Sequence, residues 1–377
     1  MNNVRWGEYK IEDLFYVEGT RSLDSNAIEF TQEGINFVGR TFENNGIQGK
    51  ITKREFEPNE PFTITATVIG NYKYVKFQKE PYYCSQNINK LTPKNIVKRW
   101  NEKVASFMVA NVQKFVSIYD GQQGGYKLED IKEHVIELPL INKEIDFEFI
   151  EEIIQEIEIE RVGKVDTYLI HTGLKDCELT KEEENAIKFY EDVEWKEFKM
   201  GKLFERLRTK KLPYKAKELP RDPVGKHTLP CLTSSFMNQG LNYYAPKENT
   251  TILKNVISIP SNSDVYRAYF QSQDFTVLSD AYAIKWIYSD GGLTNNQYLF
   301  AVPCINEVTD LPIYSYKNKL GGWNVVKEKF ISLPVKDGEP DYRFMETLIS
   351  AIKKLTIKDT VLWANQKKET ALQSLNV

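Results

Sequence analysis

Two segments of the sequence concentrate side chains that can bond to a nucleic acid. The first combines amides, cations and two tyrosines: Arg40, Asn44, Asn45, Gln48, Lys50, Lys53, Arg54, Tyr72, Lys73 and Tyr74. The second combines hydroxyls, amides and cations: Arg208, Lys210, Lys211, Ser234, Ser235, Asn238, Gln239, Tyr243, Tyr266 and Arg267. Amides, hydroxyls and guanidinium groups bond to base edges, and cations bond to phosphates. Asn and Gly are also ordinary turn residues, so DNA contact is a hypothesis that other features must decide.

Familiar catalytic patterns are missing from the sequence. It contains no phosphate-binding glycine loop, no Gly-x-Ser-x-Gly and no His-Glu-x-x-His. Its three histidines and four widely spaced cysteines offer no zinc-type spacing, and the cysteines suit reduced thiols in the cytoplasm. Asp264, Asp280 and Asp290 lack a lysine at the spacing of a metal-dependent nuclease. We therefore expect no catalytic residue, no metal site and no cofactor of the chain's own.

Charge is distributed unevenly along the 377 residues, although the net charge is only −3. Residues 143–193 hold six basic and sixteen acidic side chains, and the rest of the chain holds 44 basic and 37 acidic ones. An acidic middle segment therefore separates two mildly basic parts. The middle can be a solvated helical linker between ordinary domains, or the basic parts can bind DNA although the net charge of the chain is slightly negative. No apolar run is long enough for a membrane span, so we expect no membrane association.

The sequence contains two copies of one pattern, and matching positions are 189 to 197 residues apart. The pattern W-x-E-[YF]-K-[IM]-x-x-L-F occurs at Trp6–Phe15 and again at Trp195–Phe204. Five further blocks recur in the same order: Phe42–Gly46 with Phe236–Gly240, Phe77-Gln78 with Phe270-Gln271, Gly124–Tyr126 with Gly321–Trp323, Ile136–Pro139 with Ile331–Pro334, and Asp146–Ile150 with Asp341–Met345. Six ordered matches indicate an internal repeat of about 190 residues.

Each copy has short strand-type runs followed by a long helix. The runs at 62–69, 73–77, 256–260 and 280–287 predict strands, and Thr180 with Glu183 predicts a capped helix over 181–191. Two narrow apolar stripes predict long helices that pair antiparallel: Ile150, Ile153 and Ile157, and Met345, Leu348 and Ile352. The alternative is that each helix packs on its own domain. We expect an α+β protein with two tandem mixed α/β domains at 1–144 and 194–339, a helical spacer at 145–193 and a C-terminal helix at 340–377.

This arrangement resembles the specificity subunits of Type I restriction–modification systems. The opening W-x-E-[YF]-K-[IM]-x-x-L-F is similar to the start of their target-recognition domains, and 35–49 and 229–240 look more like the BcgI-like Type IIB branch. The resemblance implies a non-catalytic subunit that binds double-stranded DNA and docks methyltransferase subunits, possibly fused to or joined by a nuclease. S-adenosylmethionine and magnesium are then expected on the partners. The acidic segment 174–192 is longer than a minimal connector.

A bipartite, asymmetric DNA site follows from this reading, since two diverged domains should read different half-sites. A helix of about 20 residues is about 30 Å long, close to the roughly 34 Å of one B-DNA turn, which places the half-site centres about ten base pairs apart. Two other classes stay open: a tandem adaptor that binds carbohydrate or protein, and a stand-alone nuclease with an unrecognised site.

Overall fold

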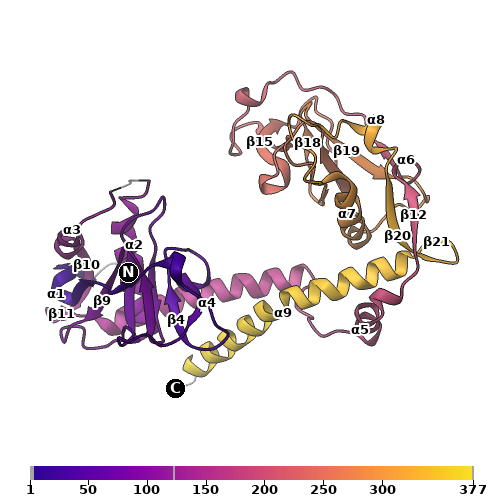
Figure 1. The fold of residues 1–377 in the computed structure, drawn as a ribbon. Coiled ribbons are helices and arrows are strands. Elements are labelled where there is room, and N and C mark those ends of the chain that lie inside the picture. The colour runs from indigo at the N-terminus through magenta and orange to yellow at the C-terminus, as the bar shows by residue number, and fades with distance from the viewer. Residues whose placement is uncertain (1–3, 122–123, 376–377) are drawn as a thin grey trace. The chain divides into compact units, whose positions relative to one another are not determined.

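The computed structural model describes residues 4–121 and 124–375, and the chain forms two compact units (Figure 1). Unit 1 consists of the residues up to Thr167 together with the segment that begins at Ala364. Unit 2 consists of Tyr168–Trp363. The division falls inside the two long helices, α4 (Phe147–His171) and α9 (Tyr342–Leu375), instead of at their ends.

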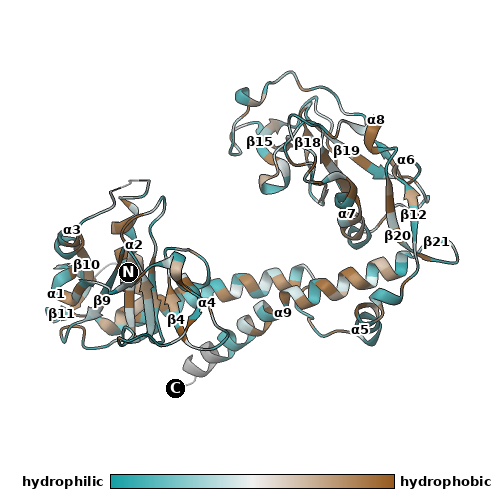
Figure 2. Cartoon of the chain, in the orientation of Figure 1, coloured by the Kyte–Doolittle hydropathy of each residue, from teal (hydrophilic) through white to brown (hydrophobic). Residues whose placement is uncertain are grey.

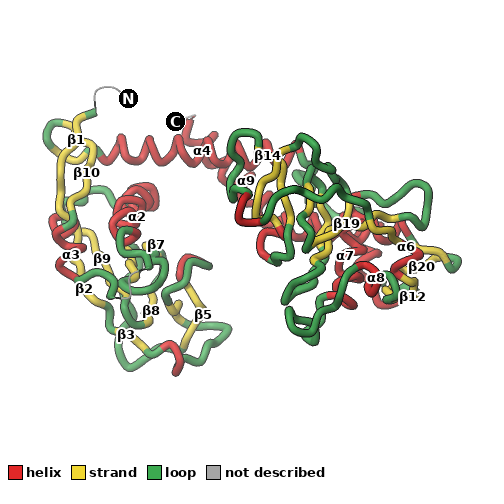
Figure 3. The backbone as a smooth tube through the Cα atoms, turned by 90° about the horizontal axis from the view of Figure 1, so that it is seen from above, coloured by secondary structure: helices red, strands yellow, loops and turns green. Residues whose placement is uncertain are grey.

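Unit 1 contains three small sheets. Their strand orders are β1-β10-β11, β2-β9-β6-β7 and β3-β8-β4-β5. The strands are β1 (Arg5–Lys10), β2 (Phe15–Gly19), β3 (Ser22–Leu23), β4 (Ile35–Val38), β5 (Ile47–Ile51), β6 (Thr63–Thr67), β7 (Val75–Gln78), β8 (Tyr82–Ser85), β9 (Ile88–Pro93), β10 (Val135–Ile141) and β11 (Glu144–Ile145). Helix α2 (Glu102–Ser117) packs on β6 and β7 (Figure 3), and the short helices α1 (Ile11–Leu14) and α3 (Leu128–Glu133) lie beside each other.

Unit 2 repeats most of this plan, but the third sheet of its described residues has three strands where that of unit 1 has four. Its strand orders are β12-β20-β21, β13-β19-β16-β17 and β15-β14-β18. The strands are β12 (Trp195–Lys199), β13 (Phe204–Arg206), β14 (His227–Leu232), β15 (Leu241–Pro246), β16 (Val256–Pro260), β17 (Tyr269–Gln271), β18 (Thr276–Val277), β19 (Ala281–Trp286), β20 (Phe330–Lys336) and β21 (Glu339–Pro340). Its helices are α5 (Lys181–Lys188), α6 (Met200–Leu203), α7 (Asn295–Thr309) and α8 (Trp323–Val326), besides the first part of α9. The predicted mixed α/β architecture is confirmed.

The repeated opening motif builds the same strand–helix–strand corner in both units. In unit 1 its last apolar positions, Ile11, Leu14 and Phe15, are fully buried at α1 and the start of β2. In unit 2 Met200 and Leu203 are buried in the same way, between β12 and β13. The motif therefore encodes one part of the hydrophobic core of each unit.

A repeated aspartate begins each of the two long helices. The Asp146 carboxylate accepts a hydrogen bond from the Phe149 backbone N–H at 3.0 Å, and the Asp341 carboxylate accepts one from the Phe344 N–H at 2.9 Å. A side-chain oxygen that accepts from the first turn satisfies a donor that the helix leaves unpaired. Hydrophobic and hydrophilic residues then alternate along α4 and α9 (Figure 2).

The apolar stripes expected to pair with each other are divided between the two cores. Ile150 is buried in the core of unit 1, and Met345 and Leu348 are buried in the core of unit 2. Packing of each helix on its own domain accounts for these three residues. Ile153 is half-buried, and Ile157 and Ile352 are exposed. The predicted coiled-coil-like pairing of these stripes is therefore not confirmed.

Within unit 1, the last part of α9 contacts α4 further along than the predicted stripe. Lys368 Nζ lies 2.9 Å from a carboxylate oxygen of the mostly buried Asp166, and Lys367 Nζ lies 3.7 Å from Glu158. Ala364 is buried at the start of this segment. The contact between the two long helices that unit 1 contains thus begins about two turns beyond Ile150, at residues that the sequence analysis did not single out.

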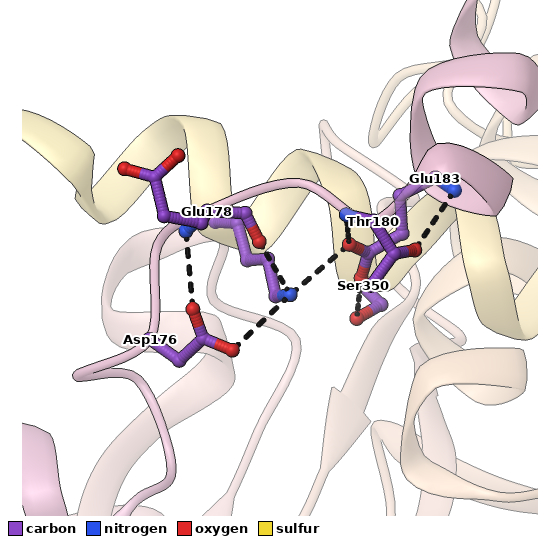
Figure 4. Close-up of polar contacts among 6 residues, drawn as sticks. Asp176, Glu178, Thr180, Glu183 and Ser350 are labelled. Atoms are coloured by element: carbon purple, nitrogen blue, oxygen red, sulfur yellow. Dashed lines mark hydrogen bonds and ion pairs between the residues drawn. The ribbon is translucent and has the colours of Figure 1, made fainter.

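Within unit 2, helix α5 is fixed to α9 by a buried carboxylate (Figure 4). Thr180 caps α5 as predicted: its hydroxyl accepts from the Glu183 N–H, and the Glu183 carboxylate accepts from the Thr180 N–H at 2.7 Å. The same carboxylate accepts from Ser350 Oγ at 2.6 Å and from Lys354 Nζ at 3.0 Å. The acidic run 182–184 therefore contains one residue, Glu183, that joins two helices.

Candidate nucleic-acid interface

The two polar segments predicted from the sequence form the same tight turn in both units. A single 3₁₀ turn covers Asn44–Gly46 between β4 and β5, and its counterpart covers Met237–Gly240 between β14 and β15. Asn45 and Gln239 both have φ near 54°, and the glycines that follow have φ of 82° and 91°. This left-handed conformation favours Asn and Gly, so the predicted turn chemistry is confirmed.

A glutamine holds each turn against the neighbouring sheet: Gln78 is buried, and Gln271 is half-buried. In unit 1, Gln78 Nε2 donates to the Asn45 carbonyl at 3.3 Å and to Thr65 Oγ1 at 3.1 Å. In unit 2, Gln271 Nε2 donates to the Gln239 carbonyl at 3.1 Å and to Ser258 Oγ at 3.0 Å. One amide group thus joins the turn to β6 or β16. Both glutamines belong to the sequence repeat, but no local pattern predicts this role for them.

A second repeated pair shapes the polar edge beside each turn. In unit 1 the exposed Gln48 side chain lies over Gly39, where an added Cβ would be 2.2 Å from Gln48 Oε1. In unit 2 the residues at the same places are Thr233 and Asn242, and Asn242 Nδ2 donates to Thr233 Oγ1 at 3.0 Å. In unit 1 the longer amide side chain of Gln48 faces Gly39, and in unit 2 the shorter amide side chain of Asn242 faces Thr233. The two edges therefore present different hydrogen-bonding groups on the same backbone.

An open hollow adjoins the turn of unit 1. It has a volume of about 520 Å³, and its lining mixes polar and apolar side chains: Ser25, Phe30, Thr41, Glu43, Asn44, Ile47 and Gln48. Two of the predicted residues, Asn44 and Gln48, belong to this lining. Amides and a carboxylate around a hollow of this size suit hydrogen bonds to the edges of bases.

Most of the predicted residues lie at the surface. The exposed ones are Arg40, Asn44, Asn45, Gln48, Lys50, Lys53, Tyr72, Arg208, Lys210, Lys211, Asn238, Gln239 and Arg267, and the half-buried ones are Arg54, Tyr74, Ser234, Ser235 and Tyr243. The structure brings the residues around each turn together. The basic residues 208–211 follow β13.

Several of these side chains already have partners within the protein. Lys53 pairs with Glu57 at 2.8 Å, and Arg267 Nε pairs with Asp310 at 2.6 Å, which raises the pKa of the guanidinium group through that hydrogen bond. Ser234 Oγ donates to Asp280 at 3.0 Å. An exposed ion pair contributes little to stability, so Lys53 and Arg267 can exchange their partners for phosphates at small cost.

The prediction of DNA contact is wrong for two residues, Lys73 and Tyr266, because both are buried. Lys73 is 1% exposed, and its ammonium group donates to the Gly70 carbonyl at 3.1 Å and to the Tyr119 carbonyl. It joins a loop to the segment after α2. Tyr266 is also 1% exposed and packs edge-on against Tyr314. The mixture of aromatic and basic residues around Lys73 and Tyr266 suggested that both side chains lie at the protein surface. Residues distant in the sequence cover both side chains instead.

Three further features of the described residues bear on function: metal-binding groups, thiol reactivity and membrane-spanning helices. No three His, Cys, Asp or Glu side chains in 4–121 and 124–375 gather closely enough to hold a metal ion. The four cysteines are buried and free, and burial raises the pKa of the Cys84, Cys231 and Cys304 thiols to about 12. None of the helices in the described parts of the chain is long and apolar enough to cross a membrane.

Comparisons with known proteins agree with this architecture. Residues 3–166 match the family model of the Type I restriction modification DNA specificity domain. The Type II restriction enzyme BgcI specificity subunit S.BcgI of Heyndrickxia coagulans is 23% identical over 349 residues, which are 92% of this chain and 94% of that protein. The Type-I restriction-modification system S subunit from M. genitalium has a similar fold, with a TM-score of 0.57 and 15% identity over 99% of this chain and 94% of that one.

Proposed function

Residues 3–166 of this chain belong to the Type I restriction modification DNA specificity domain family, and on this premise we propose that the whole chain is a restriction–modification specificity subunit that reads a bipartite DNA site. The resemblance inferred from the repeated motifs, including that to the BcgI-like branch, is confirmed by these matches. DNA recognition within a restriction–modification complex is also favoured over the adaptor and nuclease alternatives.

The observation that carries the proposal is the tethered turn that occurs once in each unit. Unit 1 contains the family domain, and unit 2 repeats the strand orders of its first two sheets, its positive-φ turn and its glutamine tether. The side chains exposed on the two turns differ: Asn44 and Asn45 in one, Asn238 and Gln239 in the other. Two domains with the same backbone turn but different exposed side chains suit the recognition of two different DNA half-sites.

Methyltransferase subunits are the partners that this function requires, either fused to a nuclease or joined by one. They would bring S-adenosylmethionine and magnesium, and the present chain would supply sequence recognition in the cytoplasm. Long helices with exposed apolar residues, such as Ile157 on α4 and Ile352 and Leu355 on α9, provide surfaces for them.

Binding of double-stranded DNA by the full chain tests the proposal. We expect one sequence to be selected from a randomised library, and we expect its affinity to fall steeply as salt rises, because phosphate contacts release counterions. A carbohydrate- or protein-binding adaptor would select no DNA sequence. Selection of one short continuous sequence would contradict the reading of two half-sites.

The first prediction concerns catalysis. The purified chain should transfer no labelled methyl group from S-adenosylmethionine to DNA and should not nick a plasmid in magnesium, because its part of the complex is recognition. Addition of the methyltransferase subunit should restore methylation of the selected sequence. Methyl transfer or nicking that co-purifies with the chain, and that survives removal of contaminants, would contradict this assignment.

A further inference from the structure

A phenylalanine is exposed beside the tethered turn in each unit. Phe42 is 67% exposed and comes two residues before the turn Asn44–Gly46. Phe236 is 50% exposed and directly precedes the turn Met237–Gly240. The two residues occupy the same position in the internal repeat. A large apolar ring in water is unfavourable, so its presence at the same place in two diverged copies points to a contact made in a complex.

In unit 1 the ring of Phe42 is supported from one side. Its centroid lies 5.6 Å from that of Tyr74, and Lys76 Nζ lies 4.5 Å from the Phe42 centroid. Tyr74 directly precedes β7, and Lys76 is the second residue of that strand. Residues two positions apart on extended backbone point to the same side. The ring is therefore held in one orientation, with a cation beside it.

In unit 2 the same two repeat positions hold a cation and an aromatic residue in exchanged order. Arg267 occupies the repeat position of Tyr74, and Tyr269 occupies that of Lys76. The Tyr269 hydroxyl donates to the Phe236 carbonyl at 3.0 Å and so fixes the backbone that carries the ring, while Arg267 pairs with Asp310. Phe42 is thus supported through its ring, and Phe236 through its backbone.

From these positions, and resting on the proposed function, we propose that Phe42 and Phe236 are specificity-determining residues that contact the 5-methyl group of a thymine in the major groove, one in each half-site. The neighbouring amides of the turn suit the polar edge of the same base pair, because thymine presents an O4 acceptor next to its methyl group. The cation beside the Phe42 ring suits the phosphate backbone that flanks the groove.

The support on Phe42 favours this contact over insertion between base pairs. An inserted side chain needs both faces of its ring free to replace stacked bases. One face of Phe42 lies under the ammonium group of Lys76. The opposite face and the edge remain available, and these suffice for an apolar contact with a methyl group.

The test combines protein and DNA substitutions with the full chain. The half-sites are first selected from a randomised duplex library by the wild-type chain, and each thymine is then replaced in turn by deoxyuridine, which lacks the methyl group. One such replacement per half-site should weaken wild-type binding about fourfold, the equivalent of one buried methyl group. Phe42→Ala should weaken binding at least as much, and it should abolish the deoxyuridine effect in one half-site alone. Phe236→Ala should do the same in the other.

Controls separate this inference from the proposed function. Tyr16→Ala removes a side chain that is 62% exposed on β2 of unit 1 and should leave binding and the deoxyuridine effect unchanged. Thermal unfolding should be the same for all three variants. If the wild-type chain selects no sequence, the proposed function fails. If it does select one, a half-site without thymine, a deoxyuridine effect that persists in Phe42→Ala, or brightening of 2-aminopurine from unstacked bases overturns the thymine contact.

Discussion

Gln78 and Gln271 each hold one of the two tight turns through a single side-chain amide. The donated bonds join a carbonyl in the left-handed region to a hydroxyl on the neighbouring strand, Thr65 in unit 1 and Ser258 in unit 2. A turn that carries base-contacting residues must keep its geometry before DNA arrives, because ordering it during binding would weaken the affinity. Gln78 supplies this order from a buried position, and Gln271 from a half-buried one.

Replacement of this tether should cost both stability and selectivity. Gln78→Leu leaves the Asn45 carbonyl and the buried Thr65 hydroxyl without their donor, so the free energy of unfolding should fall by about 1–3 kcal/mol. One half-site should also be selected less sharply. Urea unfolding and library selection measure the two effects. The exposed Asn71→Ala, at the other end of the β6–β7 connection, should change neither.

The paired residues beside the turns should be exchangeable between the units only as a pair. Gly39→Thr alone places side-chain atoms where Gln48 lies and should displace that amide. Gly39→Thr with Gln48→Asn copies the arrangement of Thr233 and Asn242, so the double variant should regain a fixed amide. Measured by binding to the selected sequence, the two substitutions should be strongly non-additive. Additive losses would show that Gln48 does not depend on the space above Gly39.

At the level of elements, α5 depends on one carboxylate for its contact with α9. Burial raises the pKa of Glu183, but bonds from Ser350, the Thr180 backbone and Lys354 outweigh it and lower the pKa from 4.5 to about 2. Because the pKa is lower in the folded chain, this contribution to stability is complete above pH 4.5 and is lost as the pH falls toward 2.

Glu183→Gln should therefore remove part of the acid sensitivity of unit 2. The wild-type chain should lose about 3 kcal/mol from this group between pH 4.5 and 2, and the variant should start lower at pH 7 and lose less over the same interval. Denaturant unfolding across this pH range measures both slopes. Glu182→Gln is the matched control, since Glu182 forms an exposed pair with Arg343 and should keep the wild-type profile. Equal slopes for wild type and Glu183→Gln would contradict the role of this carboxylate.

The elements also show what the sequence could predict. The strand expected over 256–260 is β16, and the Thr180 cap starts α5 as expected, because both depend on local patterns. The long helix expected in the spacer 145–193 is α4, which is 25 residues long and ends at His171. Asp166 of this helix pairs with Lys368, and no local pattern contains that information. The two turns were predictable because the same Asn- and Gly-containing block recurs in both copies. The burial of Lys73 was not, because it depends on Tyr119, 46 residues away.

For the whole molecule, the internal repeat predicts independent half-sites. Replacement of residues 1–140 by the corresponding domain of another specificity subunit should change one half of the methylated site and leave the other half unchanged. Mapping of methylated positions across a genome that carries each hybrid measures this. Hybrids with a longer α4 and α9 should lengthen the unread spacer, expected at several base pairs between half-sites centred about ten base pairs apart. Loss of both half-sites after one replacement would contradict independent reading.

The assignment of Ala364 and the residues after it to unit 1 has a consequence for the newborn chain. At about 5–20 residues per second, roughly 10–40 s separate the synthesis of Asp166 from that of Lys368. During that interval unit 1 has its sheets and α2, but the face of α4 that holds Asp166 and Val162 lacks the segment that contacts it. The recognition domain made first is thus the one completed last. A chain interrupted anywhere in unit 2 exposes this unfinished face to chaperones and proteases, which favours removal of partial subunits that would read half a site.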